Sequence, residues 1–183
     1  MPVVGIRGYF GGYSFCARVI LQNNEDEQGE PMRPRIERVD LTDSVAKREV
    51  EDFCHGAGLP KFAPIKGNVL AQFAMRDSEN DIGAVARLEI MLDHPFVEEV
   101  AVRADLRRKG LGKKMVGEVL EEARRRGIRT IWAMARAPNF FRGIGFGEEP
   151  DGEFRAEMIE GCEKCPDYLR VCNPVLFKKN IDK

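Results

Sequence analysis

Val100-Ala101-Val102-Arg103-Ala104-Asp105-Leu106-Arg107-Arg108-Lys109-Gly110-Leu111-Gly112 is the stretch that decides the fold. It connects a short apolar run, Val97 to Val102, which indicates a strand, to a segment with helical periodicity. Apolar residues in that segment recur every four positions, at Leu111, Met115, Val119 and Ala123, and Val116 and Leu120 widen the stripe. The spacing therefore predicts an amphipathic helix over 111–126, which ends at Gly127.

The loop between this strand and this helix has the composition of an anion site. The first turn of a helix carries N–H groups without helical partners and the positive end of the helix dipole. Gly110 and Gly112 lack a Cβ atom, so a phosphate can approach their backbone closely. Basic residues surround them: Arg107, Arg108, Lys109, Lys113 and Lys114. The pattern favours a site for a diphosphate, and the alternative is a plain loop with solvated basic side chains.

Further elements follow from the same periodicities. Strands are expected over 13–21, 35–41, 69–75, 83–92, 97–102, 128–135 and 175–177. Helices are expected from the caps Thr42 and Asp43 to Leu59, over 111–126, and over 138–144. This order predicts an α/β chain of the α+β type, with a mixed, mostly antiparallel central sheet flanked by helices.

Composition restricts the function classes. The chain has 183 residues, 43% of them hydrophobic, which predicts one domain over 1–183 with residues 1–32 as an extension carrying an extra strand. The net charge of −1 argues against a nucleic-acid partner or an anionic membrane surface. No run approaches the ~18 apolar residues of a membrane span, and no signal peptide is evident, so a cytoplasmic location is expected.

Two motifs of the chain resemble the GCN5-related N-acetyltransferase (GNAT) superfamily. Val100 to Gly112 is similar to that family's strand and its Arg/Gln-x-x-Gly-x-Gly/Ala signature. Asn139-Phe140-Phe141-Arg142-Gly143-Ile144-Gly145-Phe146 is similar to its late helix ending in Gly-Phe. The resemblance covers about four-fifths of the chain and implies a sheet that splays open in its middle around acetyl-CoA.

The resemblance also implies which residues hold acetyl-CoA. Backbone groups of the strand would pair with the pantetheine arm, the basic loop would hold the pyrophosphate, Asn139 would reach the pantetheine, and Phe140 would pack beside it. The expected cofactor-binding residues are Val100, Ala101, Val102, Arg107, Arg108, Lys109, Gly110, Leu111, Gly112, Lys113, Asn139 and Phe140. For Phe146, packing in the core is the favoured interpretation.

The implied reaction is direct attack of a primary amine on the thioester in a ternary complex. Glu98 and Glu99 are the candidate catalytic residues, and strand alternation predicts that they point to opposite faces. Glu98 shares a face with Val100 and Val102 and is the candidate base; the alternative is a solvated carboxylate. His94 and His55 are weaker candidates.

Phe141 stands where many members of the family carry a Tyr that protonates the leaving thiolate, and a Phe ring cannot do so. The thiolate would then leave unassisted, through water, or with help from another group such as Tyr168 or Cys172. This departure from the family pattern also favours an alternative function, a module that binds CoA without efficient turnover.

A cysteine-rich turn is expected over 161–173, before the last strand. Cys162, Cys165 and Cys172 form a C-x-x-C followed by a third thiol, and one more ligand would complete a structural zinc site. Candidates for it are Cys54, His55, Cys16 and Asp167. An iron–sulfur cluster and reduced thiols are the alternatives.

This cysteine tail and the paired Phe140-Phe141 resemble some short N-acetylglutamate synthase-like acetyltransferases. The resemblance favours a small-molecule acceptor, an amino acid or a polyamine, over a protein terminus or lysine. Acetyl-CoA and an amine are thus the expected partners. Oligomeric state is open, with a homodimer as one alternative.

Overall fold

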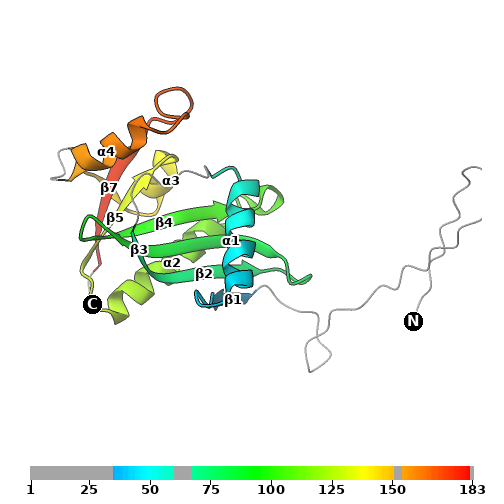
Figure 1. Cartoon of the computed structure of the whole chain (residues 1–183). Helices are drawn as coiled ribbons and strands as arrows, with labels where there is room; N and C mark the ends of the chain where they lie inside the picture. Colours follow the sequence, from blue (N-terminus) through cyan, green and yellow to red (C-terminus); the bar gives the residue numbers. More distant parts are fainter. Residues whose placement is uncertain (1–34, 60–66, 151–153, 182–183) are drawn as a thin grey trace, which may run out of the picture. The chain divides into compact units, whose positions relative to one another are not determined.

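A seven-stranded sheet forms the framework of the computed structural model, with the strand order β1-β2-β3-β4-β5-β7-β6. The strands are β1 (Arg35–Arg38), β2 (Asn68–Arg76), β3 (Ile82–Met91), β4 (His94–Val102), β5 (Thr130–Ala135), β6 (Gly147–Glu148) and β7 (Val175–Asn180). All neighbours are antiparallel except β4 and β5. The predicted mixed, mostly antiparallel sheet is therefore confirmed (Figure 1).

The structure describes residues 35–59, 67–150 and 154–181. By internal contacts the chain divides into Met1–Arg33 and Pro34–Lys183, and the fold described is that of the second unit. The extension over 1–32 and the strand expected at 13–21 lie outside the described residues.

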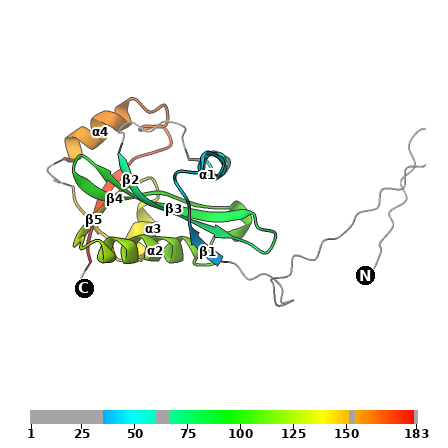
Figure 2. The ribbon, with the colours of Figure 1, turned by 60° about the horizontal axis from the view of Figure 1, so that its bottom comes forward.

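Helices cover both faces of the sheet (Figure 2). The helices are α1 (Ser44–Gly56), α2 (Leu111–Arg125), α3 (Pro138–Gly143) and α4 (Arg155–Glu163), with a short 3₁₀ turn η1 (Ala104–Leu106) before α2. The views place α1 and α4 on one face and α2 and α3 on the other. None of the helices in the described part of the chain is long and apolar enough to cross a membrane.

The apolar stripe of α2 forms the larger core, as the sequence predicts. Met115, Val116, Val119 and Ala123 are each at most 1% exposed and belong to a cluster with β2, β3, β5 and β7. Helix α1 begins as predicted, because Asp43 Oδ1 accepts a hydrogen bond from Val45 N at 2.8 Å. A separate cluster, which includes Val50, Cys54 and Ala101, packs α1 onto the sheet.

Strands β4 and β5 pair at a single position, Phe96 with Trp132. By contrast, β3 and β4 pair along most of their length, from Met91 with His94 to Ala84 with Val102. The two parallel strands therefore diverge toward the carboxyl end of β4, which opens the centre of the sheet. This divergence is the splayed sheet that the resemblance implies.

Three elements differ most from the sequence prediction: helix α4, strand β4, and the two-residue strand β6, which stands where no strand is expected. Helix α4 occupies residues where no helix is expected, and its last residues are the start of the predicted cysteine turn. Strand β4 begins at His94, earlier than expected, because Leu92 and Asp93 adopt left-handed conformations with φ of 48° and 61° and close a tight hairpin.

Candidate active site

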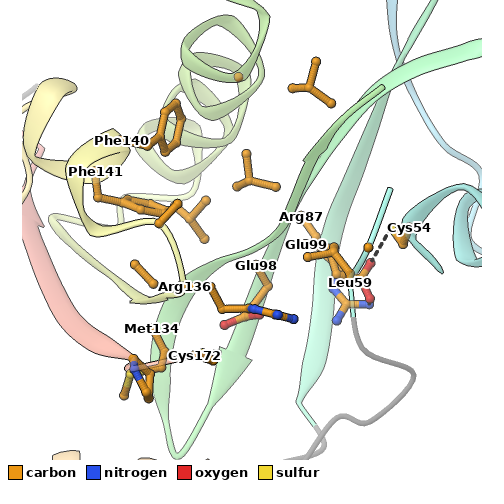
Figure 3. Close-up of a pocket in the computed structure, with 18 of the residues that line it drawn as sticks. Cys54, Leu59, Arg87, Glu98, Glu99, Met134, Arg136, Phe140, Phe141 and Cys172 are labelled. Atoms are coloured by element: carbon orange, nitrogen blue, oxygen red, sulfur yellow. Dashed lines mark hydrogen bonds and ion pairs between the residues drawn. The ribbon is translucent and has the colours of Figure 1, made fainter. Parts of the chain in front are cut away.

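A cleft of about 910 Å³ opens where β4 and β5 diverge. It extends from the end of α1 across β3 and β4 to the start of α2, to α3, and to the turn after α4 (Figure 3). Most of the residues expected to bind acetyl-CoA line it: Val100, Val102, Arg107, Arg108, Gly110, Leu111, Gly112, Lys113, Asn139 and Phe140. Two segments that are distant in the sequence thus meet at one site.

Ala101 and Lys109 are not among the lining residues. Ala101 is 6% exposed and packs in the cluster beneath α1, because alternation along β4 turns it away from Val100 and Val102. A side-chain contact between Ala101 and a ligand in this cleft is therefore not supported, whereas its backbone remains part of the lining strand.

The basic loop has the backbone shape of an anion-binding turn. Arg108 and Gly110 have φ of 63° and 79°, so the chain turns sharply just before α2 begins at Leu111. Gly110 caps the helix in the left-handed conformation, which glycine adopts at little cost. The first-turn N–H groups of α2 and the side chains of Arg108 and Lys113 thereby border the same space.

The absence of a side chain at Gly112 matters for the packing of α3 as well as for the cleft. A Cβ atom at Gly112 would lie 3.1 Å from Phe140 Cε2 and 3.3 Å from Phe140 Cζ. Helix α3 and the first turn of α2 are thus in direct contact, and the Phe140 ring closes the cleft beside the loop (Figure 3).

Arg107 contributes more than a positive charge to the loop. Its Nε donates to the carbonyl of Val102 at 2.9 Å, and its Nη2 donates to the carbonyl of Ala57 at 3.1 Å. Ala57 is the C-terminal cap of α1. Arg107 therefore joins the end of β4, the basic loop and the end of α1, which are three walls of the cleft.

Phe141 belongs to the core and to the cleft at once. It is 7% exposed, stacks on Phe177 at a centroid distance of 5.8 Å, and makes edge contacts with Phe140 and Phe146. Phe146 is 4% exposed, which confirms its expected role in packing.

Asn139 lines the cleft, and its Oδ1 accepts a hydrogen bond from Arg142 Nη1 at 2.7 Å.

Glu98 and Glu99 both face the cleft, so the prediction that they point to opposite faces is wrong. The register explains the difference: Arg87 pairs with Glu98 while Val85 pairs with Ala101, which leaves one extra residue on β4. Glu99 has a φ of 48°, outside the strand region. This β-bulge interrupts the alternation and places two adjacent carboxylates on one wall.

Burial raises the pKa of Glu98 to about 8. The nearby Arg87 guanidinium lowers this pKa, and the carboxylates of Glu89 and Glu99 raise it. Burial also raises the pKa of Glu99, again opposed by Arg87. A carboxyl group with a pKa near 8 in a cleft has the proton affinity of a general base for neutral or slightly alkaline solution.

Arg87 and Glu89 line the cleft and are not among the residues selected from the sequence. Arg87 Nη2 lies 2.7 Å from Glu89 Oε2, and Arg87 Nη1 lies 3.0 Å from Glu99 Oε1. A signal was present in the sequence. Two opposite charges stand two residues apart, hence on one face, in the otherwise apolar strand from Gly83 to Leu92.

The histidines differ in position. His55, at the end of α1, lines the cleft on the side of Glu99. His94 is outside the lining and stacks on Phe154 with a centroid distance of 4.0 Å. Its role at the start of β4 is therefore one of packing.

The cysteine turn also borders the cleft, through Cys162, Cys165, Tyr168 and Cys172. Across the described ranges, no group of three or more His, Cys, Asp or Glu side chains is arranged to hold a metal ion. The structure thus does not support the zinc site expected at Cys162, Cys165 and Cys172. The turn is instead fixed by backbone hydrogen bonds, such as Cys165 N to Cys162 O at 2.8 Å, and by the Arg136–Asp167 ion pair at 3.0 Å.

Curated relatives match part of the chain. The [ribosomal protein bS18]-alanine N-acetyltransferase of Escherichia coli strain K12 is 27% identical over 120 residues, which are 62% of this chain and 80% of the relative. The enzyme of the same description from Salmonella typhimurium strain LT2 is 29% identical over 76 residues, 39% of this chain and 51% of the relative.

Solved structures share the fold. N-acetylglutamate synthase from Neisseria gonorrhoeae, complexed with coenzyme A and L-arginine, aligns with a TM-score of 0.61 and 14% identity, over 85% of this chain and 35% of that longer chain. The ribosomal-protein-S18-alanine N-acetyltransferase from Escherichia coli aligns with a TM-score of 0.58 and 16% identity, over 82% of this chain and 95% of that chain.

The family model of the acetyltransferase (GNAT) family matches residues 40–146. The match runs from the start of α1 to Phe146 and so includes the divergent strands, the basic loop and α3. The chain belongs to the acetyltransferase (GNAT) family.

Proposed function

We propose that this acetyltransferase binds acetyl-CoA in the cleft between β4 and β5 and transfers the acetyl group directly to a primary amine. The observation that carries the proposal is that one cleft is lined both by the basic loop with Gly112 and by the Glu98–Glu99 bulge. A diphosphate fits the basic loop, and an amine that must lose a proton fits the region of the bulge.

On the cofactor side, the chain's residues bind and align the acetyl donor. The first-turn N–H groups of α2, together with Arg108 and Lys113, receive the pyrophosphate. Val100 and Val102 offer backbone groups on the strand edge that β5 leaves, and Phe140 closes the cleft beside them. Alignment of two bound reactants can lower the barrier by about 7 kcal/mol or more.

On the acceptor side, Glu98 takes the proton from the attacking ammonium, directly or through a water molecule. Its carboxylate already accepts a hydrogen bond from the backbone N–H of Glu99, which fixes it at the bulge. A backbone N–H at Val100 or Val102 supplies the donor for the oxyanion, which is typically worth about 3 kcal/mol. Phe141 offers no proton for the leaving thiolate, so water or a residue of the Tyr168–Cys172 turn serves that step.

For the acceptor we favour a small amino acid or a polyamine. The similarity of the fold to an N-acetylglutamate synthase and the cysteine turn on the acceptor side support the amino acid. The Escherichia coli relative, by its description an alanine N-acetyltransferase for a ribosomal protein, supports the second candidate, the terminal amine of a protein. A cytoplasmic location is part of the proposal, and the oligomeric state stays open, with a homodimer as one alternative.

The test is acetyl-CoA consumption by the full chain across a panel of amines. The panel contains free amino acids including glutamate, polyamines, and a peptide with an N-terminal alanine; product is identified by mass spectrometry. We expect turnover on at least one amine, with a free amino acid or a polyamine ahead of the peptide. Tight acetyl-CoA binding with no turnover on any amine would contradict the proposal and favour a CoA-binding module.

A further inference from the structure

Arg87 is the cation of β3 that faces the two adjacent glutamates of β4. The register of the two strands pairs Arg87 with Glu98, and the bulge brings Glu99 to the same side of the sheet. All three residues line the cleft, and Figure 3 shows Arg87 beside Glu99, whereas Glu98 lies apart from them, next to Arg136. The Arg87 guanidinium therefore forms an ion pair with Glu99 and acts on Glu98 through space.

Arg87 also forms an ion pair with Glu89, which lies on the same strand. The Arg87 Nη2–Glu89 Oε2 distance is 2.7 Å, and the side chain of Glu89 is only 6% exposed. Glu89 itself is confined, because a Cβ atom at Gly67 would lie 2.3 Å from Glu89 Oε1. This contact is an ion pair without a hydrogen bond, since neither Glu89 Oε2 nor Arg87 Nε has a hydrogen-bond partner in the described part of the chain. The buried negative charge of Glu89 thus keeps the guanidinium at this place, with Nη1 directed at Glu99.

The two carboxylates of the bulge have different partners. Glu99 Oε1 lies 3.0 Å from Arg87 Nη1, and Glu99 Oε2 accepts a long hydrogen bond from Cys54 Sγ of α1 at 4.0 Å. Glu99 is therefore held toward α1. The Glu98 carboxylate accepts from the backbone N–H of Glu99 and feels the guanidinium only through space.

We propose that Arg87 is a positioning residue for acetyl transfer: it holds Glu99 against the α1 side of the cleft and leaves Glu98 to take the proton of the amine. The inference rests on the function proposed above. Without Arg87, Glu99 is released toward Glu98, two like charges share one wall, and the proton affinity of Glu98 rises. The positive charge that itself lowers the pKa of Glu98 is lost as well. A residue that stabilised the fold without acting on the two carboxylates would leave the proton affinity of Glu98 unchanged.

The charged groups around Glu98 determine the direction in which each substitution shifts its pKa. Arg87 and Glu89 face it from β3, Glu99 from β4, and the Cys162 thiol interacts with it from α4. Arg136 lines the same cleft and is paired with Asp167 at 3.0 Å. Arg87 lowers the pKa of Glu98, and Glu89 raises it. Loss of Arg87 should therefore raise the pKa of Glu98, and loss of Glu89 should lower it.

The experiment is an NMR titration of the Glu98 side-chain carboxyl carbon in the full chain, with Glu98→Gln to assign the signal. In Arg87→Gln we expect the pKa of Glu98 to rise by about one unit or more, and in Glu89→Gln to fall. The matched control is Arg35→Gln, which removes an exposed arginine outside the cleft and leaves this pKa unchanged. At pH 7 each unit of increase lowers the unprotonated fraction of Glu98 about tenfold, so kcat of Arg87→Gln falls about tenfold or more while KM for acetyl-CoA is retained.

An unchanged Glu98 pKa in both Arg87→Gln and Glu89→Gln, or a shift of the same sign in both, overturns the proposal. If Arg87→Gln does not fold, Arg87→Lys and Glu89→Gln test the proposal instead. Arg87→Lys preserves the charge and should leave the pKa of Glu98 unchanged, whereas Glu89→Gln should lower it. The titration needs no turnover. A chain that acetylates no amine, yet shows the opposite shifts, contradicts the proposed function and leaves the electrostatic coupling of Arg87 to Glu98 established.

Discussion

Gly112, in the first turn of α2, lies so close to the ring of Phe140 on α3 that a Cβ atom would be 3.1 Å from Phe140 Cε2. This contact joins the two motifs that the sequence presents separately, the basic loop and the late Gly-Phe helix. It also means that the absence of a side chain at position 112 serves the packing of α3 as much as the approach of a phosphate.

Replacing Gly112 with Val should weaken the binding of acetyl-CoA. The added side chain must displace Phe140, which lines the cleft, and it takes up space beside the basic loop, so we expect Kd to rise about tenfold or more. Isothermal titration calorimetry measures the change. Gly117→Ala is the matched control, because it lies in the same helix and a Cβ there meets nothing within 4 Å. An unaltered Kd in Gly112→Val means that the loop does not border the bound cofactor.

We expect Glu98→Gln to remove the rising limb in the dependence of kcat/KM on pH. Below its pKa of about 8 Glu98 is protonated and cannot accept a proton, so kcat/KM of the native chain rises with pH through this value and levels off above it. In the variant we expect this limb to disappear and the rate above pH 8 to fall about 10²- to 10⁴-fold.

An amine that titrates near pH 8 would produce a similar limb, so the acceptor is chosen with a pKa well above 9. Glu79→Gln, an exposed carboxylate in the β2–β3 turn, is the control with the same charge change. Identical profiles for Glu98→Gln and the native chain would remove Glu98 from the mechanism.

Phe141→Tyr restores a hydroxyl where many family members carry one. Phe141 lines the cleft, so we expect the hydroxyl to reach it and to raise kcat at least several-fold if departure of the thiolate limits the rate. Pre-steady-state release of CoA, followed with a thiol reagent, measures that step. The melting temperature serves as the control for packing against Phe177. A folded variant with slower or unchanged CoA release would show that protonation of the thiolate does not limit the native enzyme.

Glu122 connects the end of α2 to β1. It is 5% exposed and accepts from Arg126 Nε at 2.7 Å, Arg125 Nη2 at 2.9 Å and Arg38 Nη1 at 3.1 Å. Glu122→Gln should lower the free energy of unfolding by about 2 kcal/mol at pH 7, because a buried carboxylate loses its charge-assisted bonds. The exposed arginines can be solvated again, which keeps the loss moderate.

The pH dependence of this loss has a definite sign. Burial opposes ionisation of Glu122, but its hydrogen bonds to Arg125 and Arg126 hold the pKa below the usual 4.5. Its contribution is therefore fully present above the unfolded pKa and is lost as the pH falls through the lower folded value. Denaturant titrations of both proteins should differ at pH 7 and converge in strong acid. A constant difference across this range would contradict the assignment.

The sequence predicts the elements whose pattern is periodic. Helix α2 and strands β2 and β3 lie within one residue or so of their expected bounds, since each has a continuous stripe or run of apolar residues. Helix α4 is not predictable in this way. Its apolar residues do not recur on one face, Gly161 within it is a poor helix former, and no side chain caps its start at Phe154.

The candidate site also has parts that the sequence predicts and parts that it does not. The basic loop is predictable because its motif combines composition with a position between a strand and a helix, and α3 because its Asn-Phe-Phe and Gly-Phe residues resemble the late helix of the family. The bulge at Glu99 is not, because the rule of alternation assumes a regular strand and an extra residue on β4 breaks it. The pairing of Arg87 with two glutamates depends on that bulge and on the register with β3, which are properties of the folded sheet.

The central claim is that the cleft between β4 and β5 binds acetyl-CoA and transfers its acetyl group to an amine. The most direct measurement is mass spectrometry of the acceptor after incubation of the native chain, and separately of Glu98→Gln and Gly112→Val, with acetyl-CoA and the amine panel. The account predicts an acceptor heavier by one acetyl group with the native chain, far less product with Glu98→Gln, and a need for much higher acetyl-CoA with Gly112→Val. Acetylated product formed equally well by all three proteins, or by none of them while the native chain is saturated with acetyl-CoA, would contradict it.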